Sequence, residues 1–335
     1  MMIRVILEPR GACTERLHSD TLFGLLCWAV RMVHGNARLE GLLAGFAEGR
    51  PPFLLSSAFP YRQLAAAAGA RPAREFFLPV PRLPLPAGRD GTERADCKEF
   101  RRCEWMPWGE FVALAAGRTT LARFLAEGAW RRWRAPALAG RLRLRARIDR
   151  LNGATTGAGT LFAAPELWVQ GGGLYFLVQP AAEPAADWLA GAVAFLNDFG
   201  WGGQNSIGLG RLEGRLEPAD ELPAPASPAR LVTLSLYHPR ADELELLRAA
   251  AARYELVRRK GKVGGHFLHT PELDTQDFWK RAVMMVAPGS TFPPLAGRRW
   301  YGDNPIVKGR DDGLPFDVQQ YGYALTAALA AAEGE

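Results

Sequence analysis

The chain is divided by one stretch that is rich in proline, alanine and acidic residues, Glu217–Pro228 (EPADELPAPASP). This stretch has the composition of a linker. On both sides of it, apolar runs with the period of strands and of helices follow one another in the order β-α-β…β-α-β. The 36 glycines and 25 prolines among the 335 residues favour many turns and a β-rich architecture. The sequence therefore predicts an α+β fold made of two sandwiches of the split-βαβ type, residues 1–217 and residues 230–335.

The individual patterns place strands and helices along both halves. In the first half we expect a helix that is capped by Ser19 or Asp20 and runs to about His34. Further helices are expected at 37–47, 110–116, 121–126 and 185–197, and strands at 2–7, 53–57 and 209–216. A hairpin of strands 159–170 and 173–179 is expected around Gly171-Gly172. Residues 71–108 show little helical pattern, which predicts a long insertion or an extended hairpin. In the second half we expect strands at 230–237, 253–258 and 281–286 and a helix at 242–252, while 318–329 fits either a helix or a strand.

Basic charge is concentrated in residues 131–150. This window holds eight arginines and one aspartate, a net +7, whereas the whole chain carries +6 and the remainder therefore −1. Within it, Arg141–Arg150 (RLRLRARIDR) alternates basic and apolar residues, which is the period of a strand. The arginines at 141, 143, 145 and 147 would share one face, with Leu142, Leu144, Ala146 and Ile148 packed inward. Four arginines without an acidic partner on that face favour binding of phosphate groups, and the alternative is the solvated face of an edge strand.

A glycine-rich segment lies between an expected helix and an expected strand, at 199–211 (FGWGGQNSIGLGR). Its five glycines let backbone N–H groups converge on an anion or on an RNA backbone. A dinucleotide site is disfavoured, because that motif lies between a strand and a following helix and has a different glycine spacing. The alternative interpretation is a flexible surface turn.

Three further segments are candidates for binding. His18-Ser19-Asp20-Thr21 lies at the start of a helix, where phosphate binds, and His18 could be a general base, although simple helix capping fits equally well. Basic residues at 98–102 are interleaved with Phe100 and followed by Trp105 and Trp108, which suits RNA, a partner interface or a solvated loop. The basic turn at 258–262 (RRKGK) is interpreted as solvated, as most such turns are.

The sequence also excludes several classes of protein. It shows no signal-peptide pattern and no apolar run of the length that spans a bilayer. The four cysteines match no zinc or redox spacing, so we expect reduced thiols in a cytoplasmic protein. Walker, HExxH and GxSxG motifs are absent and there are only five histidines. We therefore expect no metal, no cofactor, no small-molecule substrate, no membrane contact and no catalysis.

Several of these segments, taken in order, resemble one protein family. They are 18–24 (HSDTLFG) with 52–60 (PFLLSSAFP), 146–153 (ARIDRLNG) with 159–162 (GTLF), 202–211 (GGQNSIGLGR), 288–292 (PGSTF) and 320–324 (QYGYA). This ordered set spans nearly the whole chain. It resembles the RAMP subunit of type III-A CRISPR (Csm) effector complexes that caps the 5′ end of the guide RNA.

The resemblance implies two ferredoxin-like, RRM-like domains, with the glycine-rich loop closing the first and residues 80–108 forming a protruding thumb-like hairpin. It implies a non-catalytic subunit of an antiviral complex that grips the repeat-derived 5′ tag of the crRNA. The implied partners are the large polymerase/cyclase subunit and the first backbone RAMP subunit. Because related RAMP proteins cleave RNA, one alternative is a metal-independent endoribonuclease that processes CRISPR precursor RNA with His18 as its base. The other is the equivalent subunit of another type III subtype.

The residues expected to bind RNA combine the segments above. In the family the glycine-rich loop often carries a basic residue where this chain has Gln204 and Asn205. Binding there would depend on backbone N–H groups and on the arginine strand. The candidate RNA-binding residues are His18, Ser19, Thr21, Lys98, Arg101, Arg102, Arg147, Arg150, Gly202, Gly203, Gln204, Asn205, Ser206, Gly208, Gly210 and Arg211.

Overall fold

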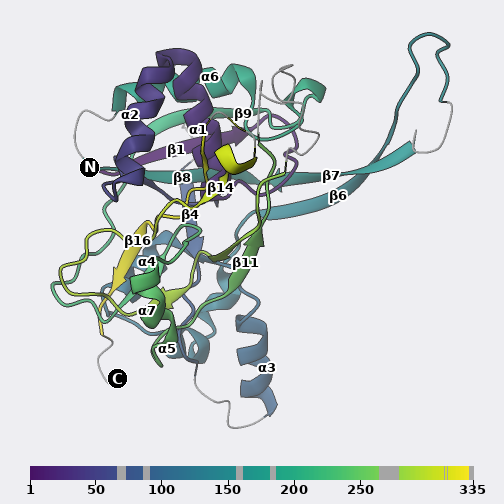
Figure 1. The fold of residues 1–335 in the computed structure, drawn as a ribbon. Coiled ribbons are helices and arrows are strands. Elements are labelled where there is room, and N and C mark those ends of the chain that lie inside the picture. Colours follow the sequence, from purple (N-terminus) through teal and green to yellow (C-terminus); the bar gives the residue numbers. More distant parts are fainter. Residues whose placement is uncertain are drawn as a thin grey trace.

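The computed structural model of the chain describes residues 1–65, 73–85, 91–155, 161–181, 186–263, 279–312, 314 and 316–331. The fold is mixed α/β with several sheets, as the sequence predicted in outline. Figure 1 shows a helical layer over a sheet in one part of the molecule, a second part with shorter strands, and a long hairpin that projects from the body.

The largest sheet is antiparallel and has the order β5-β4-β3-β8-β1-β9, with β2 pairing with β8 off this path. Its strands are β1 (Ile3–Pro9), β2 (Phe53–Leu55), β3 (Phe59–Gln63), β4 (Arg74–Pro79), β5 (Trp105–Pro107), β8 (Gly172–Pro180) and β9 (Leu212–Pro218). The central strand β8 is buried along most of its length, and it pairs with β1 on one edge and with β2 and β3 on the other. The chain therefore follows β1-α1-β3-β8-α6-β9 through the four strands β3-β8-β1-β9.

Three helices, α1 (Ser19–His34), α2 (Asn36–Ala47) and α6 (Ala186–Phe199), form the layer over this sheet (Figure 1). In α1, Leu22, Leu26, Ala29 and Val30 recur at helical spacing and are buried. The expectation that Ser19 or Asp20 caps α1 is wrong. The N-cap position is His18, which makes no side-chain capping bond, and both expected caps lie inside the helix, where their side chains bond to distant segments.

The second half contains three smaller sheets. Strand β10 (Arg230–Thr233) lies between β13 (Thr291–Phe292) and β16 (Thr326–Leu329), and β11 (Leu256–Arg259) pairs with β12 (Val283–Val286). A bridge between Tyr237 and Val286 joins the continuation of β10 to β12. Strands β14 (Ile306–Lys308) and β15 (Val318–Gln319) form the third pair. The expected helix at 242–252 is shorter, with a 3-10 turn (Ala241–Glu243) followed by α7 (Leu244–Arg248), and the ambiguous tail forms strands.

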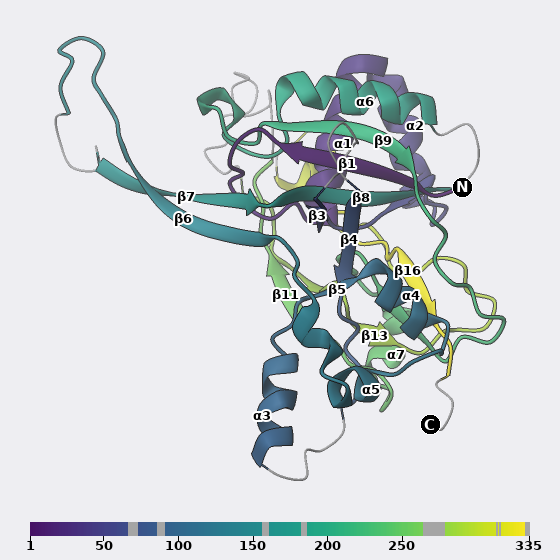
Figure 2. The same ribbon diagram turned by 180° about the vertical axis from the view of Figure 1, so that it is seen from behind.

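The protruding hairpin lies elsewhere than expected. Of the segment 71–108, the described residues form β4, α3 (Gly91–Phe100) and β5, and β4 and β5 extend the largest sheet. The hairpin that projects from the body is β6 (Ala137–Ala146) with β7 (Leu161–Gln170), as both views show (Figures 1 and 2). The expected pairing of 159–170 with 173–179 is also wrong. β7 pairs with β6, whereas the buried β8 takes its place between β1 and β3 in the large sheet.

The connection between β5 and β6 is helical. The two expected helices are present as α4 (Trp108–Ala115) and α5 (Leu121–Ala126), and a 3-10 turn follows at Ala129–Arg132. None of the described helices is long and apolar enough to cross a membrane.

The two halves of the chain share one core. The main buried cluster combines Val5 and Leu177 of the large sheet with Val232 and Leu325 of the second half. Aromatic rings also cross between the halves, with 5.2 Å between the ring centroids of Phe23 in α1 and Tyr321, and 5.6 Å between those of Phe46 in α2 and Tyr323. Burial of these rings ties the C-terminal segment to the helical layer.

Candidate nucleic-acid interface

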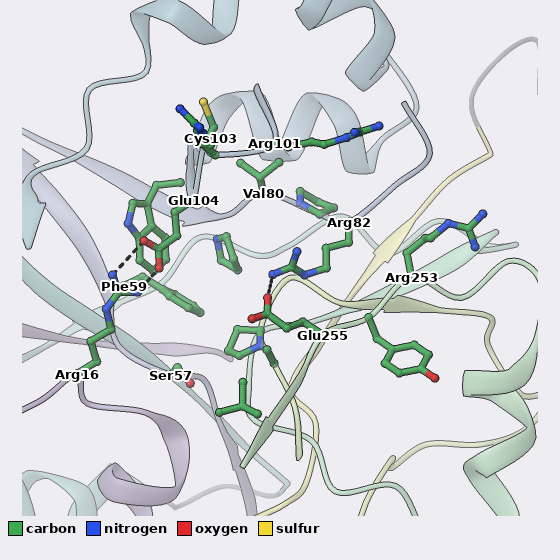
Figure 3. A pocket seen from close by; sticks show the side chains of 18 of the residues that line it. Arg16, Ser57, Phe59, Val80, Arg82, Arg101, Cys103, Glu104, Arg253 and Glu255 are labelled. Carbon is green, nitrogen blue, oxygen red and sulfur yellow. Dashed lines mark hydrogen bonds and ion pairs between the residues drawn. The ribbon is translucent and has the colours of Figure 1, made fainter. Parts of the chain in front are cut away.

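A cleft of about 940 Å³ opens where the two halves and the base of the projecting hairpin meet. Its wall is made by the segment before α1 (16–18), by 57–59, by 79–85, by the turn after α3 (100–105), and by 253–257. Leu138 and Leu167 contribute the base of the hairpin. Figure 3 shows Arg16, Phe59, Arg82, Glu104 and Glu255, which come from separate segments, around the same space. The cleft is therefore a product of tertiary packing and not of any one motif.

Arginines from four segments line this cleft. Two of them are neutralised locally, since Arg16 pairs with Glu104 and Arg82 pairs with Glu255 (Figure 3). Arg101 and Arg102 are exposed and form no ion pair with a carboxylate among the described residues. Because guanidinium groups bind phosphate oxygens in a forked geometry, this wall of the cleft can hold an anionic chain.

His18 lies in the same cleft and is held in its neutral form. Burial lowers the pKa of its imidazole to about 4, and the nearby Arg259 guanidinium lowers it further, while Asp20 acts in the opposite direction. At pH 7 the ring therefore carries no charge, and a neutral imidazole can both donate and accept a hydrogen bond. Burial also raises the pKa of the Cys103 thiol in the cleft wall.

The start of α1 is occupied by other parts of the chain. The Ser19 hydroxyl is fully buried and accepts a hydrogen bond from the backbone N–H of Leu236 at 2.9 Å. The Arg259 guanidinium donates to both carboxylate oxygens of Asp20 at 2.8 and 3.1 Å, and to the Thr21 hydroxyl at 3.3 Å. Ser19 and Thr21 therefore hold the two halves together.

Sequence reasoning missed this buried ion cluster. The amide of Gln320 donates to Asp20 at 2.6 Å, and the Lys280 ammonium lies 3.4 Å from the Gln320 side-chain oxygen. Burial lowers the pKa of Lys280. No local pattern indicates such a cluster, because its members are separated by up to 300 positions in the chain.

The glycine-rich loop is an ordered turn. Asn205–Ile207 forms a 3-10 turn, and the Asn205 side chain donates to the carbonyl of Phe199 at 3.0 Å. A Cβ atom at Gly210 would lie 2.3 Å from the carbonyl oxygen of Trp201, so only glycine fits there. The Gly210 N–H donates to Ala12 at 2.7 Å, which places the loop against the segment that leads to His18.

Part of this loop can receive an anion. The backbone N–H groups of Gly202, Gly203 and Gln204 donate to no acceptor within the described ranges of the chain, and Gly203 and Gln204 are exposed. Gln204 has a φ of 60°, in the left-handed region, so successive N–H groups turn in a way typical of anion-binding nests. Gly208 and Arg211 are exposed at the other end of the loop, and the Arg211 guanidinium donates to the Asp198 carbonyl at 3.2 Å. The side chain of Ser206 lies outside the described residues.

The arginine strand differs from the prediction in two ways. Its apolar face does not pack inward, because Leu142 and Leu144 are 75% and 70% exposed on the projecting hairpin. It also has an acidic partner, since Glu166 of β7 lies 2.9 Å from the Arg145 guanidinium and 3.6 Å from that of Arg143. The hairpin projects beyond any core that could cover its second face, and cross-strand pairing supplies the carboxylate.

The remaining candidates lie on separate surfaces. Arg147 and Arg150 are exposed beyond the end of β6, in the segment that follows this strand of the projecting hairpin. Lys98 is exposed on α3. The structure therefore brings His18, Arg101 and Arg102 together in the cleft and places the glycine-rich loop beside the segment before α1. The described ranges contain no group of three metal-ligating side chains.

Comparison with known proteins identifies the relationship. No family model matches the chain. It is 29% identical over 219 residues to Csm4, a CRISPR-system protein of Thermococcus onnurineus strain NA1, a match that spans 63% of this chain and 66% of that protein, slightly less than two thirds of its length. The chain is homologous to Csm4. The fold of this chain is similar to that of a chain in the crystal structure of a Csm1–Csm4 cassette in complex with cA4. The match covers 99% of each chain, with a TM-score of 0.58 and 21% sequence identity. A chain of a type III-A Csm3–Csm4 subcomplex is matched over 99% of this chain and 100% of that chain, with a TM-score of 0.55 and 14% identity.

Proposed function

We propose that this chain is the Csm4-type subunit of a type III-A CRISPR effector complex, that it acts without catalysis, and that it binds the 5′ tag of the crRNA. The observation that carries the RNA-binding part is the cleft that the neutral His18 lines together with Arg101 and Arg102. A neutral imidazole beside unpaired guanidinium groups suits a ligand with both phosphates and polar base edges.

The proposal includes the fold at the level of domains. We assign residues 1–217 and 230–335 to two ferredoxin-like, RRM-like domains. The path β1-α1-β3-β8-α6-β9 with the spatial order β3-β8-β1-β9 supports this for the first domain. The Tyr237–Val286 bridge supports the same plan for the second, since it links β10 to the β11–β12 pair. In this assignment the glycine-rich loop closes the first domain between α6 and β9.

The proposal also includes the protein partners. The matched structures are a Csm1–Csm4 cassette and a Csm3–Csm4 subcomplex. By analogy, this chain would bridge the large subunit and a backbone subunit. The exposed apolar residues of the projecting hairpin, Leu142, Leu144 and Leu161, support contacts with other molecules of the assembly.

Binding of tagged guide RNA tests the proposal. The chain would be co-expressed with the large subunit, the backbone subunit and guide RNA with or without its 5′ tag. We expect recovery of the assembly to depend on the tag. Arg101→Ala or Arg102→Ala should weaken RNA binding. Each should also reduce the slope of log affinity against log salt concentration by about 0.7 for each phosphate group that is no longer neutralised. Arg38→Ala, which removes an exposed arginine of α2, is the matched control. If the assembly is recovered equally well without the tag and with either arginine replaced, the RNA part of the proposal is refuted.

The absence of catalysis needs its own experiment. A neutral His18 in a cleft could accept a proton, so RNA cleavage with His18 as the base is the alternative. The purified chain would be incubated with CRISPR repeat RNA in the presence of EDTA. Intact RNA supports a scaffold, whereas cleavage that His18→Ala abolishes would support the endoribonuclease.

A further inference from the structure

The β11–β12 ribbon continues beyond its two strands and leaves one face open to solvent. Lys262 pairs with Trp279 in an antiparallel bridge, and the Lys280 N–H donates to the Gly261 carbonyl at 3.0 Å. Leu256, Arg258, Lys260 and Lys262 follow one another at two-residue spacing and are all exposed. The alternate residues Val257 and Arg259 face the cleft and the Asp20 carboxylate. Strand alternation therefore separates an interior face from an exposed basic face.

An exposed indole ring lies at the far end of this face. Trp279 is 43% exposed, and the ammonium groups of Lys260 and Lys262 lie 5.4 and 4.9 Å from its ring centroid. These two contacts place both lysines on the same side of the ribbon as the ring. An aromatic ring flanked by cations stacks a nucleobase while the cations contact the adjoining phosphates.

Two cations of this face have no carboxylate partner in the part of the chain that the structure describes. Arg258 and Lys260 form no ion pair with a carboxylate among the residues that the structure describes. Glu255, three residues before Arg258, is paired with Arg82 in the cleft. Met284, opposite Arg258, adds an exposed apolar side chain.

The face is continuous with the cleft. Arg253 and Tyr254 line the cleft three and two residues before the start of β11, and Tyr254 is 43% exposed. From Tyr254 to Lys262 the chain advances by eight residue steps, about 26 Å at about 3.3 Å per residue. An extended ligand held in the cleft can therefore continue along the ribbon to Trp279.

We propose that the residues Tyr254, Leu256, Arg258, Lys260, Lys262 and Trp279 form a track for single-stranded RNA that leads away from the cleft. This inference rests on the proposed function and extends it by a second binding surface. RNA is favoured over a protein partner because the centres of protein interfaces are depleted in lysine, whereas here lysines flank the aromatic ring. The sequence-based interpretation of the turn at 258–262 as merely solvated changes accordingly.

Two RNA lengths separate the track from the cleft. Fluorescence anisotropy would measure binding of the co-expressed assembly, after removal of its own guide, to labelled single-stranded RNAs of about 8 and about 25 nucleotides that share the tag sequence. We expect Trp279→Leu to weaken binding of the longer RNA about tenfold and to leave the shorter one unchanged, because the stacking of one base is removed. Trp279→Phe keeps an aromatic ring and should bind nearly as the natural chain does.

The charges are tested in the same assay. Arg258→Ala and Lys260→Gln should each lower the log–log salt slope for the longer RNA by about 0.7, and Arg38→Ala is again the control. If these variants bind the longer RNA normally while Arg101→Ala weakens both RNAs, the track is rejected and the proposed function stands. Loss of a protein subunit at unchanged RNA affinity would make the face a protein interface and would also overturn the track. If neither RNA binds the natural assembly, the proposed function and the track both fail.

Discussion

Replacement of His18 by glutamine should reduce the dependence of stability on pH. Burial and the neighbouring Arg259 lower the pKa of His18 from 6.5 to about 4 in the folded chain. In the unfolded chain the ring is protonated below pH 6.5, so between pH 6.5 and 4 the unfolded state binds more protons. The stability that this neutral ring provides is therefore fully present above pH 6.5 and is lost as the pH falls toward 4.

The magnitude follows from the two pKa values. A shift from 6.5 to about 4 corresponds to at most about 3.5 kcal/mol over the whole window, at about 1.4 kcal/mol per unit. At pH 5 about 2 kcal/mol of this is lost. Glutamine keeps a neutral polar side chain of similar size and does not titrate. Between pH 7.5 and pH 5, the unfolding free energy of His18→Gln should therefore fall by about 2 kcal/mol less than that of the natural chain.

Urea unfolding at pH 7.5 and pH 5, followed by circular dichroism, measures this difference. His34→Gln removes an exposed imidazole at the other end of α1 and is the matched control for loss of one histidine. Burial also raises the pKa of Glu15. Because Glu15 is present in both the natural chain and His18→Gln, its contribution cancels in the difference between them. Equal losses of stability in the natural chain and in His18→Gln would show that the imidazole is not desolvated and would refute the reasoning.

Three further predictions concern stability and reactivity. Gly210→Ala should cost about 2–4 kcal/mol of unfolding free energy, because its Cβ would lie 2.3 Å from a backbone oxygen at a φ of +70°, whereas Gly208→Ala, with no atom within 4 Å, should cost only about 1 kcal/mol for its left-handed backbone; thermal melts of both variants test the contrast. Glu243→Ala should cost about 3 kcal/mol in urea unfolding, because this fully buried carboxylate accepts one tyrosine and two backbone donors; a loss below about 1 kcal/mol would contradict this. Burial raises the pKa of Cys13 to about 11 and of Cys27 to about 12, so at pH 8 a thiol reagent should modify both at least about a hundredfold more slowly than in urea, as mass spectrometry of the modified peptides would show.

The sequence predicted local structure well where one periodic pattern determines it. The helices at 37–47, 121–126 and 185–197 lie within about two residues of their predicted positions, because buried side chains at helical spacing define them. The sequence was less successful at predicting which strands pair with each other. The run at 161–170 has the period of a strand in either pairing, and nothing in its own residues shows that it pairs with 137–146 and not with the strand that follows it.

The candidate site was predictable only in parts. The helix start at His18 and the basic residues at 101–102 were identified from their own chemistry, but nothing in the sequence indicated that they line one cleft. For the arginine strand, the sequence predicted burial that the structure does not show. Alternation predicted a buried apolar face, yet Leu142 and Leu144 are exposed, because the strand belongs to a hairpin that extends beyond the core.

By itself, the sequence predicted most of the helices and strands, and it carries a set of ordered segments that resembles the Csm family. These features depend on residues that are close together in the chain. Tertiary structure alone decided the cleft, the Arg259–Asp20 pair across the two halves, and the continuation of the basic β11 face from that cleft. The physical reason is that burial, pKa shifts and charge compensation arise between residues up to hundreds of positions apart, and only the folded chain brings them into contact.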